Sequence, residues 1–271
     1  MKDFGQGVAL VTGGASGIGF GLANALGRAG MKVAIADLDQ AGCERAAGEL
    51  RAKGVTVLPL TLDVRDGAAW EQTVDRVERE LGPLQVLCSN AGVGGSKLPI
   101  EQTTWEGWKW TLEVNLDSVF HGFKASLPRM RRHGLPSHIV CTASLGGLLV
   151  IADNGVYSAT KAGVIALCEA VAQETAGSNI GVSVLCPGLV QTSLLKNRER
   201  LKPGQFDIGA LEAGRDIGMS TGIDAQQLGE QVVAWMREGR FWMITHPELR
   251  PHVEARCDAI LAAMQPAVAP D

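Results

Sequence analysis

The stretch VALVTGGASGIGFGLANALG, residues 8–27, joins an apolar run to a glycine-rich turn and then to a segment of helical character. A buried strand that leads through glycines into a helix aims backbone N–H groups and the positive end of the helix at one point, where an anion such as a pyrophosphate can bind. Glycines also serve ordinary tight turns, and Gly13, Gly17 and Gly19 do not have the GxGxxG spacing. The turn alone therefore leaves both interpretations open.

Seven apolar runs of strand length alternate with segments of helical period. They span residues 8–13, 32–37, 55–60, 84–89, 138–144, 181–188 and 240–246. Their near-continuous hydrophobicity is typical of strands covered on both faces, and the segments between them are long enough for crossover helices. The sequence therefore predicts an α/β fold, a Rossmann-like, doubly wound, seven-stranded parallel sheet with helices on both faces. Since no linker or internal repeat divides the chain, residues 1–271 are expected to form a single domain.

Composition narrows the range of partners. The net charge of −4 comes from acidic and basic residues mixed along the chain, so no nucleic-acid surface is expected. No apolar run approaches the roughly 20 residues of a membrane helix, and the first one begins too early to leave room for a signal peptide. The six cysteines form no CxxC pair and the five histidines no HxH or HExxH pattern. We therefore expect reduced thiols, no metal, and a cytoplasmic protein that acts on a small molecule.

An acidic residue, Asp37, ends the second apolar run. At the carboxyl end of a strand beside the glycine turn, its carboxylate can accept both hydroxyls of an adenosine ribose, whereas a 2′-phosphate would meet like charge. Neither Ser16 nor Leu38 could supply a cation for that phosphate. These features favour NAD over NADP. Without the glycines, Asp37 would read instead as a solvated acid that starts the next helix.

The only tyrosine of the chain stands in YSATK, residues 157–161, four positions before a lysine. On a helix, Tyr157 and Lys161 lie one turn apart on the same face. A lysine cation about 6 Å from a phenol, together with an oxidised nicotinamide, would bring the tyrosine pKa from near 10 toward neutrality. Such a tyrosine can exchange a proton with an alcohol or carbonyl oxygen while hydride moves to or from the nicotinamide. In isolation, the alternative is an ordinary surface tyrosine.

Together these motifs resemble the short-chain dehydrogenase/reductase family, in its single-domain branch. The matching motifs are TGGASGIG (12–19), Asp37, LDV (62–64), NAG (90–92), Asn115, Ser144, YSATK (157–161) and PGLVQT (187–192). Their order and spacing agree with the family pattern from residue 8 to about residue 192. One departure is Ser89, which stands where the family often has a further asparagine before NAG and which alters only a structural turn residue.

The resemblance assigns a role to each of four residues, which form the predicted catalytic set. Tyr157 would be the general acid/base, and Ser144 would hydrogen-bond the substrate oxygen. Lys161 would tune the tyrosine and hold the nicotinamide ribose. Asn115 would bind the water that links the lysine to bulk solvent, and an asparagine inside an apolar helix does need a compensating role.

The resemblance also implies NAD as the cofactor. Asp63 would recognise the adenine amino group, and residues 90–92 would pack under the adenosine. Residues 187, 188 and 192 would meet the nicotinamide amide and its phosphate. The full predicted cofactor-binding set is Gly13, Ser16, Gly17, Ile18, Gly19, Asp37, Leu38, Asp63, Val64, Asn90, Ala91, Gly92, Tyr157, Lys161, Pro187, Gly188, Val190 and Thr192.

The predicted function is hydride transfer between NAD and a secondary alcohol or ketone. Residues 189–223 have no strand character and predict a lid over the substrate. Apolar lid residues such as Leu194 and Leu195 favour a lipophilic or aryl substrate, whereas the basic residues between 196 and 202 leave an anion open. In MKDF, TGGASGIGFG and ASLGG the chain is also similar to Cα-dehydrogenases that oxidise benzylic alcohols of lignin-type aryl ethers.

Two other functions remain compatible with the sequence, namely an NADPH-dependent carbonyl reductase and a non-catalytic dinucleotide-sensing protein on the same fold.

Two helices predict self-association. Residues 103–110, TTWEGWKW, combine a threonine cap with tryptophans at helical spacing, and the helix within 158–174 is lined with alanine and glycine. By the resemblance these two helices form a dimer face, and a homotetramer or homodimer is expected. Near the end of the chain, a helix would carry an apolar face made of Leu249, Val253, Cys257, Ile260, Leu261 and Met264. Residues 265–271 are expected to fray.

Overall fold

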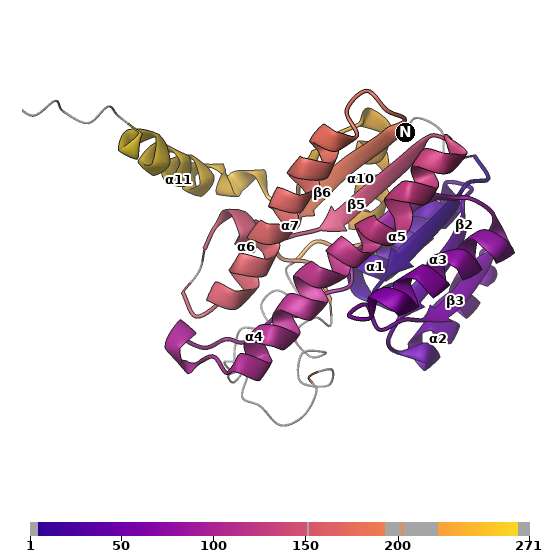
Figure 1. The fold of residues 1–271 in the computed structure, drawn as a ribbon, viewed down its shortest axis with the longest axis horizontal. Helices are drawn as coiled ribbons and strands as arrows, with labels where there is room; N and C mark the ends of the chain where they lie inside the picture. The colour runs from indigo at the N-terminus through magenta and orange to yellow at the C-terminus, as the bar shows by residue number, and fades with distance from the viewer. Residues whose placement is uncertain (1–4, 151, 193–201, 203–221, 265–271) are drawn as a thin grey trace, which may run out of the picture.

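The computed structural model of the chain describes residues 5–150, 152–192, 202 and 222–264. At its centre lies a sheet of seven parallel strands in the order β3-β2-β1-β4-β5-β6-β7 (Figure 1). The strands are β1 (Val8–Thr12), β2 (Lys32–Asp37), β3 (Val57–Thr61), β4 (Leu84–Ser89), β5 (Ser137–Thr142), β6 (Ile180–Cys186) and β7 (Trp242–Ile244). All seven predicted strands are confirmed, with ends that differ by at most two residues.

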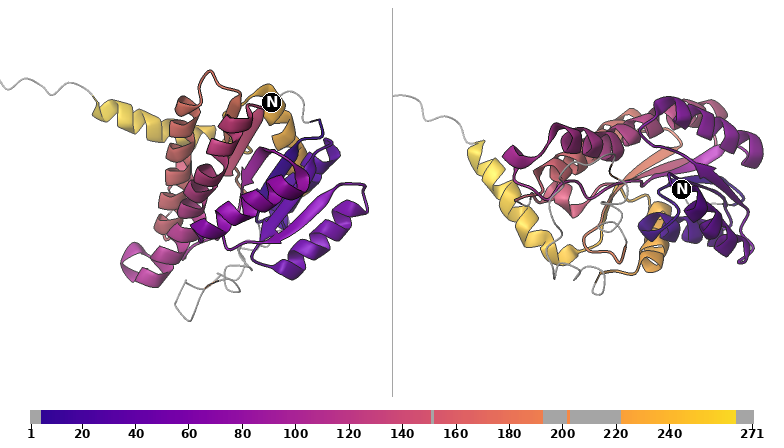
Figure 2. Two further views of the ribbon diagram at one scale, coloured as in Figure 1. Left: turned by 45° about the vertical axis from the view of Figure 1, so that its right-hand side comes forward. Right: turned by 90° about the horizontal axis from the view of Figure 1, so that it is seen from below.

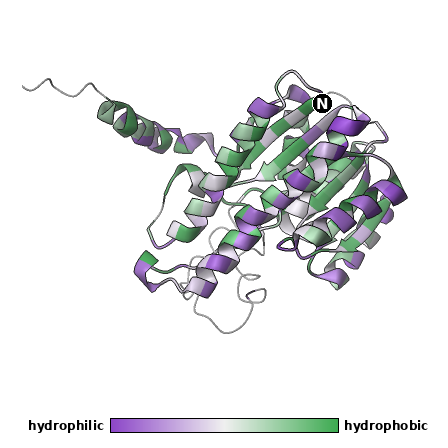
Figure 3. Cartoon of the chain, in the orientation of Figure 1, coloured by the Kyte–Doolittle hydropathy of each residue, from purple (hydrophilic) through white to green (hydrophobic). Residues whose placement is uncertain are grey.

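Helices cover both faces of this sheet, as Figure 2 shows from two further directions. The six that pack on it are α1 (Gly17–Arg28), α2 (Gln40–Arg51), α3 (Gly67–Leu81), α5 (Ser118–His133), α7 (Gly155–Glu174) and α10 (Ala225–Glu238). One cluster of buried side chains joins the sheet to α3, α5 and α7, and a second joins its other face to α1, α2 and α10. Most of the strand residues are accordingly green, that is hydrophobic, in Figure 3. The predicted doubly wound α/β fold is confirmed.

Five short elements and one longer helix complete the described part of the chain. They are η1 (Ile100–Gln102), α4 (Trp105–Leu112), η2 (Glu113–Asp117), α6 (Leu145–Leu148), η3 (Pro247–Leu249) and α11 (Arg250–Ala263). The predicted helix in 103–110 starts at Trp105, where the side chain of Thr104 accepts the N–H of Gly107 at 3.1 Å. A π-helical turn, η2, connects α4 to α5 without a break. This turn carries Asn115, so that residue sits at an irregularity and not in a regular helix.

The strand order reverses beside β1, and this reversal creates the place for a ligand. β1 pairs with β2 on one side and with β4 on the other. The chain builds outward from β1 to β3 and then returns to start the second half at β4. In such sheets the connections leave β1 and β4 in opposite directions, so a crevice opens at their carboxyl ends. The glycine turn follows β1 and the NAG motif follows β4.

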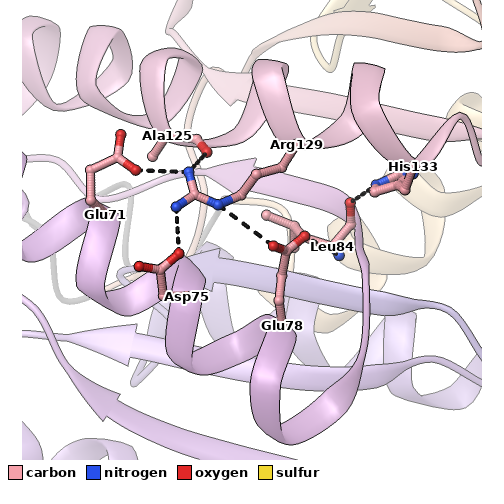
Figure 4. A network of polar contacts seen from close by, with 7 residues as sticks. All are labelled: Glu71, Asp75, Glu78, Leu84, Ala125, Arg129 and His133. Carbon is pink, nitrogen blue, oxygen red and sulfur yellow. Dashed lines mark hydrogen bonds and ion pairs between the residues drawn. The ribbon is translucent and has the colours of Figure 1, made fainter.

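An arginine with three acidic neighbours ties α3 to α5 on the outer side of the sheet (Figure 4). The guanidinium of Arg129 on α5 lies 2.7 Å from Glu71, 2.5 Å from Asp75 and 3.5 Å from Glu78, all on α3. It also donates to the carbonyl oxygen of Ala125 at 2.5 Å. Only 12% of the Arg129 side chain is exposed. Its ion pairs with the three acidic residues therefore join the two helices where solvent is partly excluded.

The last helix, α11, projects away from the sheet (Figures 1 and 2), and none of its residues is buried. The predicted helix is confirmed, but its apolar face is open. Cys257 is exposed there, unlike the other five cysteines, which are buried. Within the described ranges no helix is both long and apolar enough to cross a membrane. Most of the predicted lid, 189–223, and the predicted tail, 265–271, lie outside the described residues.

Candidate active site

Glycines at the carboxyl end of β1 let the turn pack closely against two other segments. A Cβ atom placed on Gly17 would lie 3.2 Å from Cγ2 of Thr192, and one on Gly13 would lie 3.0 Å from Cα of Ala91. Both glycines also have positive φ angles, +64° at Gly13 and +53° at Gly17, which other residues adopt at a cost. The backbone of the turn thus lies directly against the segments around residues 91 and 192.

The first turn of α1 keeps its backbone donors free of side-chain caps. Ser16 occupies the N-cap position and makes no capping hydrogen bond. By contrast, α2, α3 and α10 each begin with an aspartate whose carboxylate accepts backbone N–H groups. Uncapped N–H groups at the positive end of a helix are suited to a phosphate anion. The residues present therefore fit the pyrophosphate of a dinucleotide, and Gly17, Ile18 and Gly19 would hold it.

Asp37 lies beside this turn, at the carboxyl end of β2. Its Oδ2 accepts the N–H of Ala15 at 3.3 Å, and its Oδ1 accepts the N–H of Asp39 at 3.1 Å. These bonds turn the carboxylate toward the glycines and leave lone pairs for ribose hydroxyls. Leu38, the next residue, is 49% exposed and brings no charge. The position fits an unphosphorylated ribose.

Asp63 follows β3 and is already engaged with a neighbour that sequence reasoning did not foresee. Nη2 of Arg65 lies 2.6 Å from its Oδ2, and the backbone N–H of Arg65 is 3.1 Å from its Oδ1. This hydrogen bonding, opposed by burial, lowers the pKa of Asp63. The side chain of Val64 belongs to the core, and its carbonyl oxygen accepts the indole N–H of Trp70 at 2.9 Å. Recognition of an adenine by Asp63 would therefore involve the Asp63–Arg65 pair.

The NAG segment is fastened by threonines at two strand ends. Oγ1 of Thr12, the last residue of β1, accepts the N–H groups of Asn90 at 3.0 Å and Ala91 at 3.1 Å. The side-chain amide of Asn90 donates to the Thr12 carbonyl oxygen at 3.1 Å. Its Oδ1 accepts the hydroxyl of Thr142, the last residue of β5, at 3.0 Å. Asn90 thus links the carboxyl ends of β1 and β5, and Ala91 lies against Gly13.

Ser144 and Tyr157 face each other across a glycine. Ser144 precedes α6, where its Oγ accepts the N–H of Gly146 at 3.0 Å. Tyr157 lies in the first turn of α7. A Cβ atom on Gly146 would lie 3.2 Å from Cε1 of Tyr157 and 3.4 Å from Oγ of Ser144. The absence of a side chain at Gly146 lets the serine hydroxyl reach the phenol.

The acidity of Tyr157 in the protein alone is governed by burial. Burial raises the pKa of Tyr157 above its ordinary value, and the hydrogen bond from Ser144 lowers it by less. Nζ of Lys161 is 5.8 Å from the centroid of the tyrosine ring, close to the expected separation. The predicted lowering of the tyrosine pKa requires an oxidised nicotinamide beside this lysine, so it stays a prediction.

Lys161 itself is a buried cation with few partners. It is 4% exposed, and its Nζ donates to the carbonyl oxygen of Thr142 at 2.8 Å. Burial lowers the pKa of Lys161 to about 8, although Cys141 and Cys186 act in the opposite direction. A Cβ atom on Gly92 would lie 3.4 Å from this Nζ. The ammonium therefore faces the NAG segment, where two of its three donors remain available to a ribose.

Asn115 links the π-helical turn to the segment that follows the NAG motif. Its Oδ1 accepts the N–H of Val93 at 2.8 Å, and its amide donates to the Val93 carbonyl oxygen at 2.9 Å and to Oγ1 of Thr160 at 3.3 Å. These bonds use its side chain to join η2, α7 and the residues after β4. The compensating role that the sequence demanded is thus a structural one, and a water would have to bind through its backbone.

The segment after β6, residues 187–192, closes one side of the crevice. The N–H of Leu145 donates to the carbonyl oxygen of Pro187 at 3.0 Å, which ties this segment to the residue after Ser144. Val190 forms a bridge with Ile223 and packs against the core beneath α1 and α10. Thr192 lies against Gly17. The structure brings the predicted residues of this segment to the same sheet edge as the glycine turn.

Sequence reasoning missed several residues that shape the site. Thr12 and Thr142 hold Asn90, and Cys186 lies next to Tyr157 and Lys161, with the N–H of Ser144 directed at its sulfur. Burial raises the pKa of Cys186 to about 12, so it remains a thiol. All three end a strand of the parallel sheet. Their position at the carboxyl ends of strands is the signal that could have found them.

The glycine turn follows β1, and Lys161, beside Tyr157, is bonded to the last residue of β5, so the turn and the phenol lie toward the same edge of the sheet. This is the arrangement of oxidoreductases that carry hydride on a dinucleotide. Within the described ranges, no three His, Cys, Asp or Glu side chains converge in the manner of a metal site.

Comparison with known proteins identifies the family. A family model described as short chain dehydrogenase matches residues 7–202. The C alpha-dehydrogenase of Sphingobium sp. (strain NBRC 103272 / SYK-6) is 36% identical over 272 residues, which cover 98% of this chain and 89% of that protein. The structure of LigD in its apo form from Sphingobium sp. strain SYK-6 has a TM-score of 0.82 at 34% identity, covering 98% of this chain and 100% of that chain.

A second structure extends the similarity to a complex. A short chain dehydrogenase/reductase from Burkholderia phymatum in complex with NAD has a TM-score of 0.90 at 29% identity, and 100% of each chain is covered. The chain belongs to the short-chain dehydrogenase family. It is an oxidoreductase of the alcohol dehydrogenase type that uses a nicotinamide cofactor.

Proposed function

We propose that this enzyme interconverts a secondary alcohol and its ketone with NAD as the coenzyme. The observation that carries the proposal is the set of Ser144, Tyr157 and Lys161, a buried ammonium beside a partly buried hydroxyl and phenol, on the sheet edge that also holds the glycine turn. A sensor that binds a dinucleotide without turnover would have no use for a buried ammonium one helical turn from this phenol. Burial of the ammonium destabilises the fold, so a chemical role accounts for it better than a structural one.

The protein's own residues divide the proton chemistry among them. When bound, the oxidised nicotinamide accepts the hydride that leaves the carbinol carbon. Tyr157 takes the proton of the substrate hydroxyl, while the hydroxyl of Ser144 donates to the developing carbonyl oxygen and fixes its position. Lys161 favours the phenolate that this transfer requires and holds the ribose with its free donors. Asn115 would bind the water that returns the proton to solvent, and in the reductive direction each transfer reverses.

The choice of NAD over NADP rests on Asp37. Its carboxylate is held toward the glycine turn by Ala15, at the place where a ribose would lie. A 2′-phosphate there would stand against a like charge, and the neighbouring Ser16 and Leu38 offer no cation. The relative from Burkholderia phymatum was crystallised with NAD. The alternative function is an NADPH-dependent carbonyl reductase, and the preference of the enzyme for NADH or NADPH distinguishes the two.

A lipophilic or aryl secondary alcohol is the proposed substrate class. Exposed apolar side chains stand around the site, with Val150 after α6 at 68% exposure and Leu189 after β6 at 55%. Leu145, next to Ser144, is apolar as well. The similar Sphingobium protein is named a C alpha-dehydrogenase, which fits oxidation at a benzylic carbon. Apolar walls with a few polar groups at one end are typical of sites for such substrates.

Coenzyme titration and a substrate panel test the proposal together. NADH and NADPH are titrated by fluorescence, with Asp37→Ser as the matched variant. Wild type is expected to bind NADH at least tenfold more tightly than NADPH, and the variant to lose most of this preference. Oxidation of 1-phenylethanol should then exceed that of cyclohexanol. Equal binding of NADPH by the wild type would refute the Asp37 argument, and failure to bind either coenzyme or to oxidise any alcohol would refute the function.

We further propose that the enzyme is a cytoplasmic homotetramer or homodimer whose subunits meet through α7 and through the helix that begins at α4 and continues into α5. The outer face of α7 exposes Ala159, Ala166 and Ala170, and Phe120 on α5 is 50% exposed. Small residues on one helix allow another helix to pack closely, and an exposed aromatic supplies apolar area. Ala166→Glu should dissociate the assembly in sedimentation experiments. A wild-type protein that sediments as a monomer would refute this part.

A further inference from the structure

Two residues beyond the family motifs support the segment that closes the crevice. Thr245 and His246 follow β7, the edge strand of the sheet. β6 and β7 pair from Val184 to Cys186 and no further, so the ladder ends at the start of the segment 187–192. Just past that point, the N–H of Gly188 donates to Oγ1 of Thr245 at 3.0 Å. The hydroxyl of Thr245 therefore links the segments after β6 and β7 just beyond the last backbone pairing of the two strands.

Thr245 makes hydrogen bonds to two residues. Its Oγ1 lies 2.6 Å from Nδ1 of His246 and also accepts the N–H of Gly188. A hydroxyl oxygen can accept two hydrogen bonds and donate one, so either tautomer of His246 can make this contact. The chain of bonds runs from Gly188 through Thr245 to His246.

The imidazole of His246 also occupies the space beside Gly188. A Cβ atom on Gly188 would lie 2.5 Å from Nδ1 and 2.8 Å from Cε1 of His246. Any side chain at position 188 would displace the ring or the segment. On the opposite side, the N–H of Leu145 holds the carbonyl oxygen of Pro187 at 3.0 Å. The dipeptide 187–188 is thus held between the residue that follows Ser144 and the Thr245–His246 pair.

We propose that Thr245 and His246 are positioning residues for the nicotinamide half of the coenzyme. The inference rests on the proposed function, in which Pro187 and Gly188 meet the nicotinamide amide. Neither residue needs to touch the coenzyme, because they act by setting the position of the backbone that does. Loss of the Thr245 hydroxyl leaves the N–H of Gly188 without its partner and lets the segment drift from the carboxyl end of β6. A small displacement there should weaken nicotinamide binding and misplace it for hydride transfer.

The test compares two ligands that differ in the nicotinamide alone. ADP-ribose has the adenosine, the pyrophosphate and the second ribose, whereas NADH has the nicotinamide in addition. In Thr245→Val, which keeps the shape and removes the hydroxyl, the Kd of NADH should rise about fivefold, while the Kd of ADP-ribose stays within twofold. Thr245→Ser keeps the hydroxyl and should bind both ligands like the wild type. Thermal unfolding of each variant checks that the fold is unchanged.

A second pair of variants tests the histidine. His246→Phe removes the ring nitrogen that bonds Thr245 and should weaken NADH binding about threefold, whereas His246→Asn places an amide group, which can donate or accept, near the Nδ1 position and should restore it. The inference is overturned if NADH affinity in Thr245→Val stays within twofold of wild type, or if NADH and ADP-ribose weaken together. If the wild type binds NADH and Thr245→Val binds it equally well, the result contradicts this inference and leaves the proposed function standing. A wild type that binds neither NADH nor NADPH contradicts the proposed function and with it the inference.

Discussion

Replacing Lys161 by methionine should make the protein more stable while it destroys activity. Lys161 is 4% exposed, and burial lowers its pKa to about 8, compared with 10.5 for an ordinary lysine. That difference corresponds to about 3.4 kcal/mol opposing a charged ammonium at this place at pH 7. Methionine has a similar length and no charge, but it leaves the carbonyl oxygen of Thr142 without a donor, at a cost of about 1 kcal/mol. Lys161→Met should therefore be about 2 kcal/mol more stable than wild type at pH 7.

The pH dependence of this difference has a definite sign. The folded pKa of Lys161, about 8, lies below the unfolded value of 10.5, so below pH 8 both states bind the proton and the full penalty is present. Between these values the folded state releases a proton that the unfolded state keeps, so wild-type stability rises with pH relative to the variant. From pH 7 to pH 9 the advantage of Lys161→Met should shrink by about 1.4 kcal/mol.

Urea unfolding at pH 7, 8 and 9 measures this difference for wild type and variant in parallel. The buried thiols, whose pKa values burial raises to about 12 at Cys43 and Cys88, reduce stability at alkaline pH in both proteins and cancel in the comparison. Lys109→Met, at a lysine that is 75% exposed, is the control and should show no such change with pH. Turnover of Lys161→Met should fall at least about 100-fold. A variant less stable than wild type at pH 7, or a difference independent of pH, would refute the reasoning.

Three further predictions concern the tyrosine, the helix pair of Figure 4 and a buried histidine. Tyr157→Phe should lower turnover about 1,000-fold and leave NADH affinity within threefold, and near-native turnover would contradict the acid/base role. Arg129→Ala leaves three carboxylates facing one another and should lower the free energy of unfolding in urea by about 2 kcal/mol. Arg76→Ala, at an exposed ion pair, is the control and should lower it by at most about 0.5 kcal/mol. Equal losses in the two variants would contradict the prediction. Burial lowers the pKa of His138 to about 3, below its unfolded value of 6.5, so the unfolded chain alone takes up this proton and stability should fall by about 2 kcal/mol from pH 8 to pH 5. His138→Gln, which can still donate to Ser183, should lack that part of the fall, and an unchanged pH profile would contradict the assignment.

The strands and the catalytic spacing could be predicted because both follow local rules. A parallel strand covered on two faces must be almost entirely apolar, and β6 and β1 show this pattern directly. The four-residue spacing of Tyr157 and Lys161 is a property of one helix. The glycine turn likewise lies within one strand-turn-helix unit. Each of these features depends only on residues close together in the chain, so it can be recognised in the sequence.

The supports of the site could not be predicted in the same way, because they join distant parts of the chain. The bond from Asn90 to Thr12 spans 78 positions, the bond from Thr142 to Asn90 spans 52, and the bond from Gly188 to Thr245 spans 57. No periodicity connects residues so far apart. Their partners are determined by the strand order, which places the ends of β1, β4, β5 and β7 along one edge. Topology has to be known before such a threonine can be given a role.

The acidity of Tyr157 depends on burial as well as on spacing, and it bears on how the enzyme works. Spacing places an ammonium one turn away, but the cost of ionising the phenol depends on how much water α6 and α7 exclude from it. Burial raises the pKa of Tyr157, so the phenol of the protein alone keeps its proton at neutral pH. Lys161 favours the phenolate, but its own pKa lies near 8 and its ammonium is bound to Thr142. The expectation from the sequence adds the positive charge of an oxidised nicotinamide to that of the lysine, so we expect Tyr157 to become a base for alcohol oxidation only when the coenzyme is in place.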